Sequence, residues 1–346
     1  MSSGQSVVEI VCDESGNTGE NVTQIANGVF AEGSHDLSPD EALEVIRWVR
    51  TQTGSKAAEI KWKQLRDQQW LIAELFQQKM AGRSRIYLVE KTYFTVGKVV
   101  DLLLEEHAFS EGRDLYSTGV AKEYASLLYR DGPRALGAEN WTALLRAFNS
   151  LMRHDTATQR LRSTPKATVD EFFDLLDRSR HLARRRNVAR VLTDLAKTKS
   201  IAEQFVHDLD ASTTKLSALD PLIPSVAQTV RHWAADHKGK TIRVIHDQGP
   251  LPSSGALDVV VDGLRDPGEF RRLAPAVDIA SIDTADSKSD VRVQLADLIA
   301  GFGSHVGFLA LTGALSEDLA EIARPMIASS SLWGHDDSAR TLGLSM

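Results

Sequence analysis

Residues 7–19 read VVEIVCDESGNTG, and this stretch decides the fold. Its first half is a run of β-branched and apolar residues, which predicts a buried strand. Its second half is rich in Ser, Gly, Asn and Thr, which is typical of a turn. A second apolar run at 25–31 predicts a hairpin. Asp13 therefore stands where a buried strand ends, and its carboxylate is not solvated like one on the surface.

The composition of the 346-residue chain bounds the class of protein. A hydrophobic content of 42% with 25% charged residues is that of a soluble globular protein. The net charge of -7 argues against a protein that coats nucleic acid, but a nuclease with a local basic face is compatible with it. We expect no membrane span and a cytoplasmic location, because no long apolar run and no signal peptide is evident. The single cysteine, Cys12, excludes an intramolecular disulfide and is expected to fill the core.

Strands and helices alternate in both terminal parts of the chain, which predicts an α/β fold. The helix after Ser38 has the clearest start, with Pro39 at its first position and Glu41 three residues after the cap. Further strands are expected at 85–91, 241–246 and 277–282, and further helices at 65–80, 252–264, 291–305 and 316–328. Residues from about 329 onward are expected to be loosely ordered.

Residues 96–239 differ from the rest because strand signals nearly vanish and helical periodicity dominates. This segment is far longer than an ordinary crossover connection. We predict a large all-helical insertion or subdomain at 96–239, and an α/β core made by 1–95 and 240–346. The expected helices cover 96–107, 117–130, 139–153, 168–183, 186–197, 199–209 and 222–237.

Four acidic residues stand at positions that suggest a metal site. Asp13 and Asp247 end predicted strands, Asp297 lies beside the apolar face of a helix, and Glu59 lies in a short extended piece at 57–62. If they converge, they repel one another unless a hard cation lies between them, which predicts Mg²⁺ or Mn²⁺. The alternatives are local turn bonds for Asp13 and Asp247, a bond from a nearby Ser or Lys for Asp297, and a surface ion pair for Glu59.

Several other side chains are candidate phosphate contacts. Lys61 shares a side with Glu59 if that segment is extended. Gly16 lets a ligand approach the turn where Ser15 and Asn17 stand. The remaining candidates are Ser287, Lys288 and Lys91.

An arginine-rich stretch in the helical region is a candidate nucleic-acid interface. Arg180, Arg184 and Arg185 are its central members, and positions 180 and 184 share a face if both are helical. An acidic protein that binds a polyanion concentrates its cations somewhere. The alternative is a solvated face paired with its acidic neighbours, Asp174, Asp177 and Asp194.

Together, four motifs resemble the family grouped as domain of unknown function 3800. They are Asp13-Glu14-Ser15-Gly16, Glu59-Ile60-Lys61, Asp247-Gln248 and Gln294-Leu295-Ala296-Asp297. The resemblance covers about 5–95 and 240–305. That family is similar to the ribonuclease-H-like superfamily, which implies a mixed sheet flanked by helices and a carboxylate metal centre. One departure is that a helix and Glu59 precede the third strand, whereas the ribonuclease H order begins with three consecutive strands.

These observations lead to a hypothesis of a metal-dependent nuclease that hydrolyses phosphodiester bonds of DNA or RNA. Asp13, Glu59, Asp247 and Asp297 would hold one or two Mg²⁺ or Mn²⁺ ions. The resemblance also suggests a role in phage defence or mobile-element biology. Two alternatives stay open. One is a catalytically silent module that binds nucleic acid, a protein or a second copy through its helical part, and the other is a metal-dependent hydrolase of small phosphoesters.

Overall fold

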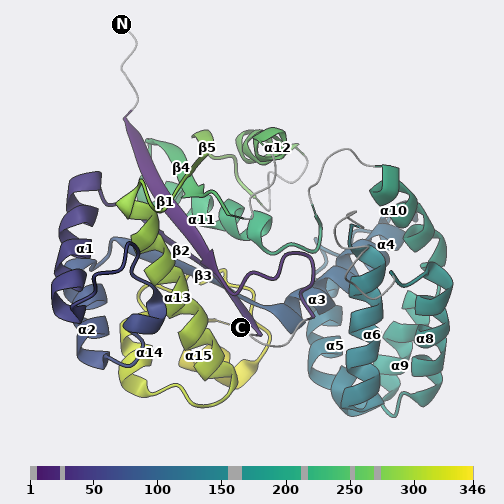
Figure 1. Cartoon of the computed structure of the whole chain (residues 1–346). Coiled ribbons are helices and arrows are strands. Elements are labelled where there is room, and N and C mark those ends of the chain that lie inside the picture. Colours follow the sequence, from purple (N-terminus) through teal and green to yellow (C-terminus); the bar gives the residue numbers. More distant parts are fainter. Residues whose placement is uncertain are drawn as a thin grey trace, which may run out of the picture.

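A computed structural model describes residues 6–23, 28–154, 166–211, 217–249, 254–268 and 274–345. Its centre is one mixed sheet in the order β3-β2-β1-β4-β5 (Figure 1). The strands are β1 (Val7–Ser15), β2 (Val29–His35), β3 (Ser84–Glu90), β4 (Thr241–Asp247) and β5 (Ile279–Ala285). Strand β2 is antiparallel to both β1 and β3, whereas β4 and β5 continue the sheet parallel to β1. The expected α/β class is confirmed; residues 25–27 of the expected hairpin lie outside the described residues.

The register of β1 fixes which side chains share a face of the sheet. Asp13 lies opposite Gly33 of β2, and Glu14 lies opposite Glu32. Because side chains alternate along a strand, Asp13 and Glu14 point to opposite faces. Helix α13 (Val291–Leu311) covers the Asp13 face, and helices α11 (Leu222–Asp236) and α12 (Ser254–Arg265) cover the other (Figure 1).

Helix α13 lies directly on the sheet because small residues permit close contact. A Cβ on Gly33 would stand 2.3 Å from the backbone nitrogen of Ala300, and one on Gly303 would stand 2.5 Å from Ile86 Cγ2. The helix runs past its expected end at His305. By length and composition it is the one helix in the described residues that would suit a membrane span, but most of it is buried inside the molecule.

The remaining core elements pack around the α13 side of the sheet. Helix α1 begins with the expected capping box, in which Ser38 and Glu41 bond each other's backbone N–H, and it ends at Gly54 with a φ of 63°. Residues 57–61 lie in a loop and form no strand, although Lys61 itself has an extended backbone. The elements are α1 (Pro39–Thr53), η1 (Trp62–Gln64), α2 (Gln69–Glu74), the π-helical η2 (Leu75–Lys79), α14 (Glu317–Ala323) and α15 (Asp336–Thr341).

The C-terminal segment is ordered, so the expectation of a loose end was wrong. Ile327 and Leu332 form parallel bridges with β3. Trp333 is buried, and its indole N–H donates to Ser338 Oγ at 2.8 Å. The segment therefore extends the sheet at the β3 edge.

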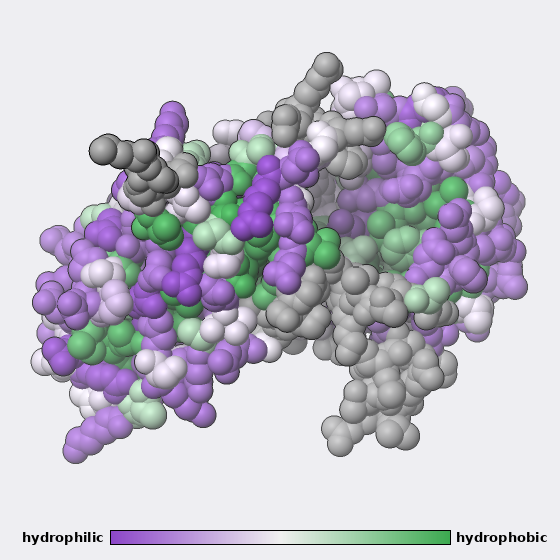
Figure 2. Space-filling view, turned by 90° about the horizontal axis from the view of Figure 1, so that it is seen from above, coloured by the Kyte–Doolittle hydropathy of each residue, from purple (hydrophilic) through white to green (hydrophobic). Residues whose placement is uncertain are grey.

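The helical part forms a lobe beside the α/β core, and the view from above shows a largely hydrophilic surface on both (Figures 1 and 2). Its own apolar core includes Phe148, Phe172 and Leu192. Its helices are α3 (Lys91–Val99), the π-helical η3 (Val100–Glu105), α4 (Glu106–Ser110), α5 (Val120–Leu136), α6 (Ala138–Met152), α8 (Val169–Leu182), α9 (Arg186–Leu195) and α10 (Lys199–Ala211).

The boundaries of this lobe differ from the expected 96–239. The lobe begins with α3, directly after β3. Helix α11 packs on the sheet instead, where Trp233 is buried with Ile10 and donates to Ser34 Oγ at 2.9 Å. The contact could not be read from the sequence because it joins residues 199 positions apart.

Candidate functional site

The site begins with two carboxylates at the ends of neighbouring parallel strands. Cys12 and His246 are Cα partners, so Asp13 and Asp247 follow them side by side. Two residues earlier, Val11 and Ile245 pack against Val293 and Ala296 of α13. Side-chain alternation therefore turns Asp13 and Asp247 toward α13 as well.

Asp297 joins them from α13. The turn from Ala296 to Ala300 lies against Gly33, which is the β2 partner of Asp13. Burial, together with the charges of Glu14, Asp297 and Asp247, raises the pKa of Asp13 to about 9. Burial also raises the pKa of Asp297. The charges of Asp247 and Asp297 thus act on Asp13, so three of the four predicted metal ligands lie near one another.

Glu59 and Lys61 reach the same place from the loop before η1. Lys61 Nζ lies 3.2 Å from Glu59 Oε2 and 3.3 Å from Asp297 Oδ2. Ser287 Oγ donates to Glu59 Oε1 at 3.0 Å, and this bond and Lys61 lower the pKa of Glu59. Gln294 holds the preceding turn, since its Nε2 donates to the Ser287 carbonyl at 2.9 Å. The structure thus joins Lys61 to both Glu59 and Asp297 and Ser287 to Glu59, and it contains the ion pair given as the alternative.

The other predicted phosphate contacts are more scattered. Asn17 makes a local turn bond, accepting from the Gly19 N–H at 2.7 Å. Ser15 ends β1 half-buried, and Lys288 is exposed near Glu59. Lys91 is only 2% exposed and lies at the loop after β1, with Nζ 3.4 Å from Thr18 Oγ1. Burial lowers its pKa to about 8.

The arginine stretch does not form one helical face, so that expectation was wrong. Helix α8 ends at Leu182, which leaves Arg184 outside it. Arg180 pairs with Asp177 at 2.6 Å, and Arg185 Nη1 lies 3.3 Å from Asp131 Oδ1 of α5.

A second cluster, on the opposite face of the sheet, was not predicted. His246 Nε2 lies 3.7 Å from both Glu14 Oε2 and Glu32 Oε1, and both His246 and Glu32 are fully buried. Burial alone would lower the pKa of His246, but Glu32 and Glu14 raise it to about 9. The only sequence signal was the alternation that turns Glu14 away from Asp13.

The donor chemistry around Asp297 suits a hard divalent cation, although the side chains are not arranged around one. Among the residues that the structure describes, no three His, Cys, Asp or Glu side chains form a ready metal cluster. However, Asp297 Oδ2 and Gln294 Oε1 are buried without a hydrogen-bond partner. Asp297 Oδ2 has only its ion pair with Lys61. Oxygen ligands of this kind are those that Mg²⁺ prefers.

The site therefore combines buried carboxyl and amide oxygens with the ammonium of Lys61. Comparisons with protein-family models, with curated proteins and with solved structures find no match for the chain. The function is therefore argued from the geometry of the site.

Proposed function

We propose that this chain is a metal-dependent nuclease with a ribonuclease-H-like core, related to the domain of unknown function 3800 proteins that its motifs resemble. The observation that carries the proposal is the convergence of Asp13, Asp247 and Asp297 at one edge of a mixed sheet. The strand arrangement supports it too. The first three strands of the chain form the antiparallel half of the sheet, although helices lie between β2 and β3.

In this proposal, Asp13, Asp247, Asp297 and Glu59 would hold one or two Mg²⁺ or Mn²⁺ ions. When bound, such ions activate water and stabilise the leaving oxygen of a phosphodiester. Asp13, with its pKa near 9, loses its proton when a cation binds. A cytoplasmic location and a role in phage defence or mobile-element biology are proposed from the resemblance alone.

The neighbouring polar residues have supporting roles. Lys61 is a flexible ammonium that would be free to contact a substrate phosphate if a cation took its place beside Asp297. Ser287 fixes the Glu59 carboxylate through its hydroxyl. Gln294 fixes the backbone of that serine.

A catalytically silent binding module is the second candidate. The observation that favours it is Lys61, whose ammonium already satisfies Glu59 and Asp297. In such a protein the lysine would replace the metal permanently, and nucleic acid or a protein partner would bind without being cut.

Cleavage and metal binding by Asp13→Asn and Asp297→Asn variants test the proposal. We expect the rate of Mg²⁺- or Mn²⁺-dependent cleavage of DNA or RNA to fall in both variants. The fall should exceed the roughly 10- to 100-fold loss that is typical when a residue supporting a metal ligand, and not the ligand itself, is replaced. Asp258→Asn is the matched control, because Asp258 is exposed on α12. Nucleotides and other small phosphoesters are assayed beside single- and double-stranded substrates.

Full activity in Asp13→Asn would refute the assignment of Asp13. Calorimetry that detects no metal binding at millimolar concentrations, with nucleic-acid binding intact, would favour the silent module. Hydrolysis of small phosphoesters alone would replace the nuclease with a phosphoester hydrolase.

A further inference from the structure

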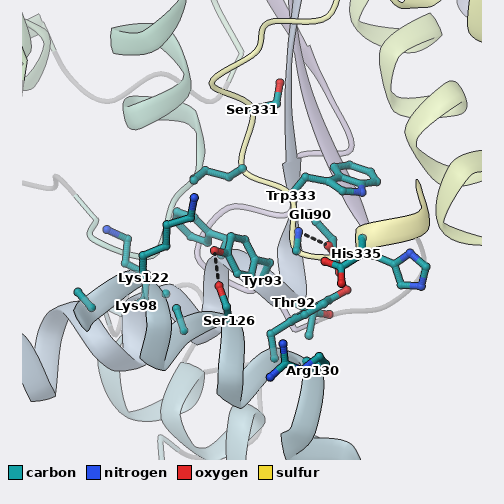
Figure 3. Close-up of a pocket in the computed structure, with 18 of the residues that line it drawn as sticks. Glu90, Thr92, Tyr93, Lys98, Lys122, Ser126, Arg130, Ser331, Trp333 and His335 are labelled. Atoms are coloured by element: carbon teal, nitrogen blue, oxygen red, sulfur yellow. Dashed lines mark hydrogen bonds between the residues drawn. The ribbon is translucent and has the colours of Figure 1, made fainter. Parts of the chain in front are cut away.

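A cavity of about 1120 Å³ lies between the helical lobe and the C-terminal segment (Figure 3). Helices α3, α5 and α6 form one side, and the end of β3 with residues 329–337 forms the other. None of the four predicted metal ligands lines it. It nevertheless lies at the same edge of the sheet, because β3 and β1 run in the same direction with only β2 between them. Two strand spacings separate β3 from β1 by about 10 Å.

The α5 wall of the cavity presents a stripe of polar and cationic side chains. Lys122, Ser126, Arg130 and Arg134 all line it and recur every four residues. This interval places them on one face, about 6 Å apart along the helix axis at each step. Within the described part of the chain, Lys122 and Arg134 have no carboxylate partner. Lys98 of α3 adds a further cation to this wall (Figure 3).

The opposite wall carries hydrogen-bond acceptors. Glu90 accepts from the Tyr129 hydroxyl and from the Gly334 N–H at 2.9 Å. His335 and Asp336 lie on the same wall. Another carboxylate among the lining residues, Asp101 on the cationic side, is engaged by the Tyr116 hydroxyl and by Lys98. Cations and most acceptors are therefore segregated on facing walls.

Aromatic rings lie between these walls. Tyr93 and Tyr129 meet edge to face with centroids 5.5 Å apart, and Trp333 closes the C-terminal side. Tyr116 is 45% exposed, the most accessible ring in the cavity.

Arg184 and Arg185, which were singled out in the sequence, contact α5 but do not line the cavity. Asp131 of α5 is shared by Arg130 at 3.4 Å and Arg185 at 3.3 Å. The Arg184 N–H donates to the Ala135 carbonyl at 3.0 Å. The start of α9 is thereby joined to the C-terminal half of α5, next to Arg134.

We propose that this cavity is a binding channel for single-stranded nucleic acid. The phosphates lie along the α5 stripe, the bases stack on the tyrosines, and the carboxyl and imidazole groups of the facing wall accept from base amino groups. A single nucleotide would need one cation, whereas this stripe spans three helical turns. The volume suits a few nucleotides and not a duplex. The inference rests on the proposed nuclease function, since it leads the strand toward Asp13.

Binding is measured by the anisotropy of a fluorescein-labelled single-stranded oligonucleotide. Metal is removed with EDTA, so that cleavage plays no part. Relative to wild type, a Lys122→Glu, Arg134→Glu variant is expected to bind more weakly. Its log-log salt slope should be flatter by about 1.4, because each phosphate contact on a single strand contributes about 0.7. Arg178→Glu with Arg190→Glu is the matched control, since it makes the same charge change at exposed positions outside the cavity.

Stacking is tested separately at Tyr116. Tyr116→Ala is expected to weaken binding about 5- to 150-fold, the range for loss of one base-aromatic stack. Tyr116→Phe keeps the ring and should bind much as wild type does. Thermal melts check that each variant is folded. If the Lys122→Glu, Arg134→Glu variant unfolds, a Lys122→Gln, Arg134→Gln variant replaces it. That variant is also expected to flatten the salt slope.

An unchanged affinity and salt slope in the folded charge variants would overturn the channel. Absence of strand binding by wild type, or binding of a labelled mononucleotide but not of the strand, would overturn it as well. Failure of the nuclease proposal gives a different result: wild type then shows no metal-dependent cleavage, while the binding measured in EDTA still depends on Lys122 and Arg134.

Discussion

Replacing Gly33 with alanine tests how closely α13 must approach the sheet. Gly33 lies in β2 without a positive φ, so alanine is acceptable to its backbone. Its Cβ, however, would stand 2.3 Å from the Ala300 nitrogen and 2.8 Å from the Ala296 carbonyl oxygen. Both are backbone atoms of α13, so no side-chain rotation relieves the contact.

The magnitude follows from these distances. Ordinary contact is restored only if α13 moves away from β2 by about 1 Å, and overpacking of this kind costs about 1–3 kcal/mol. The displaced turn also carries Asp297, which faces Asp13 across the site. Misplacement by about 1 Å can reduce a catalysed rate by roughly 100-fold. We therefore expect Gly33→Ala to lose stability and the proposed cleavage together.

Urea unfolding measures the loss of stability, and an assay of Mg²⁺-dependent cleavage measures the loss of the proposed activity. Gly263→Ala is the control, because no atom lies within 4 Å of a Cβ built at Gly263 in α12. That variant is expected to gain about 0.5–1 kcal/mol. The close approach of α13 would be refuted if Gly33→Ala were as stable as wild type.

Two further predictions concern His35 and Lys61. His35 is fully buried, with Nε2 2.9 Å from the Arg292 carbonyl, and burial lowers its pKa to about 4. Below pH about 6.5 the imidazole is protonated in the unfolded chain but stays neutral in the folded protein. The free energy of unfolding should therefore fall by about 3 kcal/mol from pH 6.5 to 4. A pH series of melts on His35→Gln should lack this fall. Lys61→Met removes a cation from Glu59 and Asp297. Calorimetry should then show Mg²⁺ binding that is roughly two- to fivefold tighter, while the rate of cleavage falls. Weaker Mg²⁺ binding would contradict the ion-pair geometry.

The parts of the site that the sequence predicts are those set by local chemistry. The apolar runs before Asp13 and Asp247 identify β1 and β4, and both carboxylates follow at the strand ends. Ends of parallel strands meet at one edge of a sheet, so their proximity follows once the strands are neighbours. The periodicity of α13 likewise indicated that Asp297 lies beside an apolar face.

The remaining features depend on which distant segments become neighbours. Glu32 belongs to a strand with no distinguishing pattern, and it becomes a partner of His246 only because β1 lies between β2 and β4. Lys91 was predicted to contact phosphate, but its burial depends on the loop of Thr18. The wall formed by Trp333 was missed because the C-terminal segment lacks periodicity, whereas its contacts with β3 are long-range.

The arrangement of charge explains how several acidic side chains can lie together at the end of β1. Consecutive residues of β1, Asp13 and Glu14, supply carboxylates to opposite faces of the sheet. His246 offsets the charge on the Glu14 face, and Lys61 offsets it on the face of Asp297. The two cations differ in mobility, since His246 is fully buried whereas the Lys61 side chain is 48% exposed. The first is a fixed part of the fold. In the proposed function, a divalent cation would therefore take the place of Lys61, on the α13 face, and not that of His246.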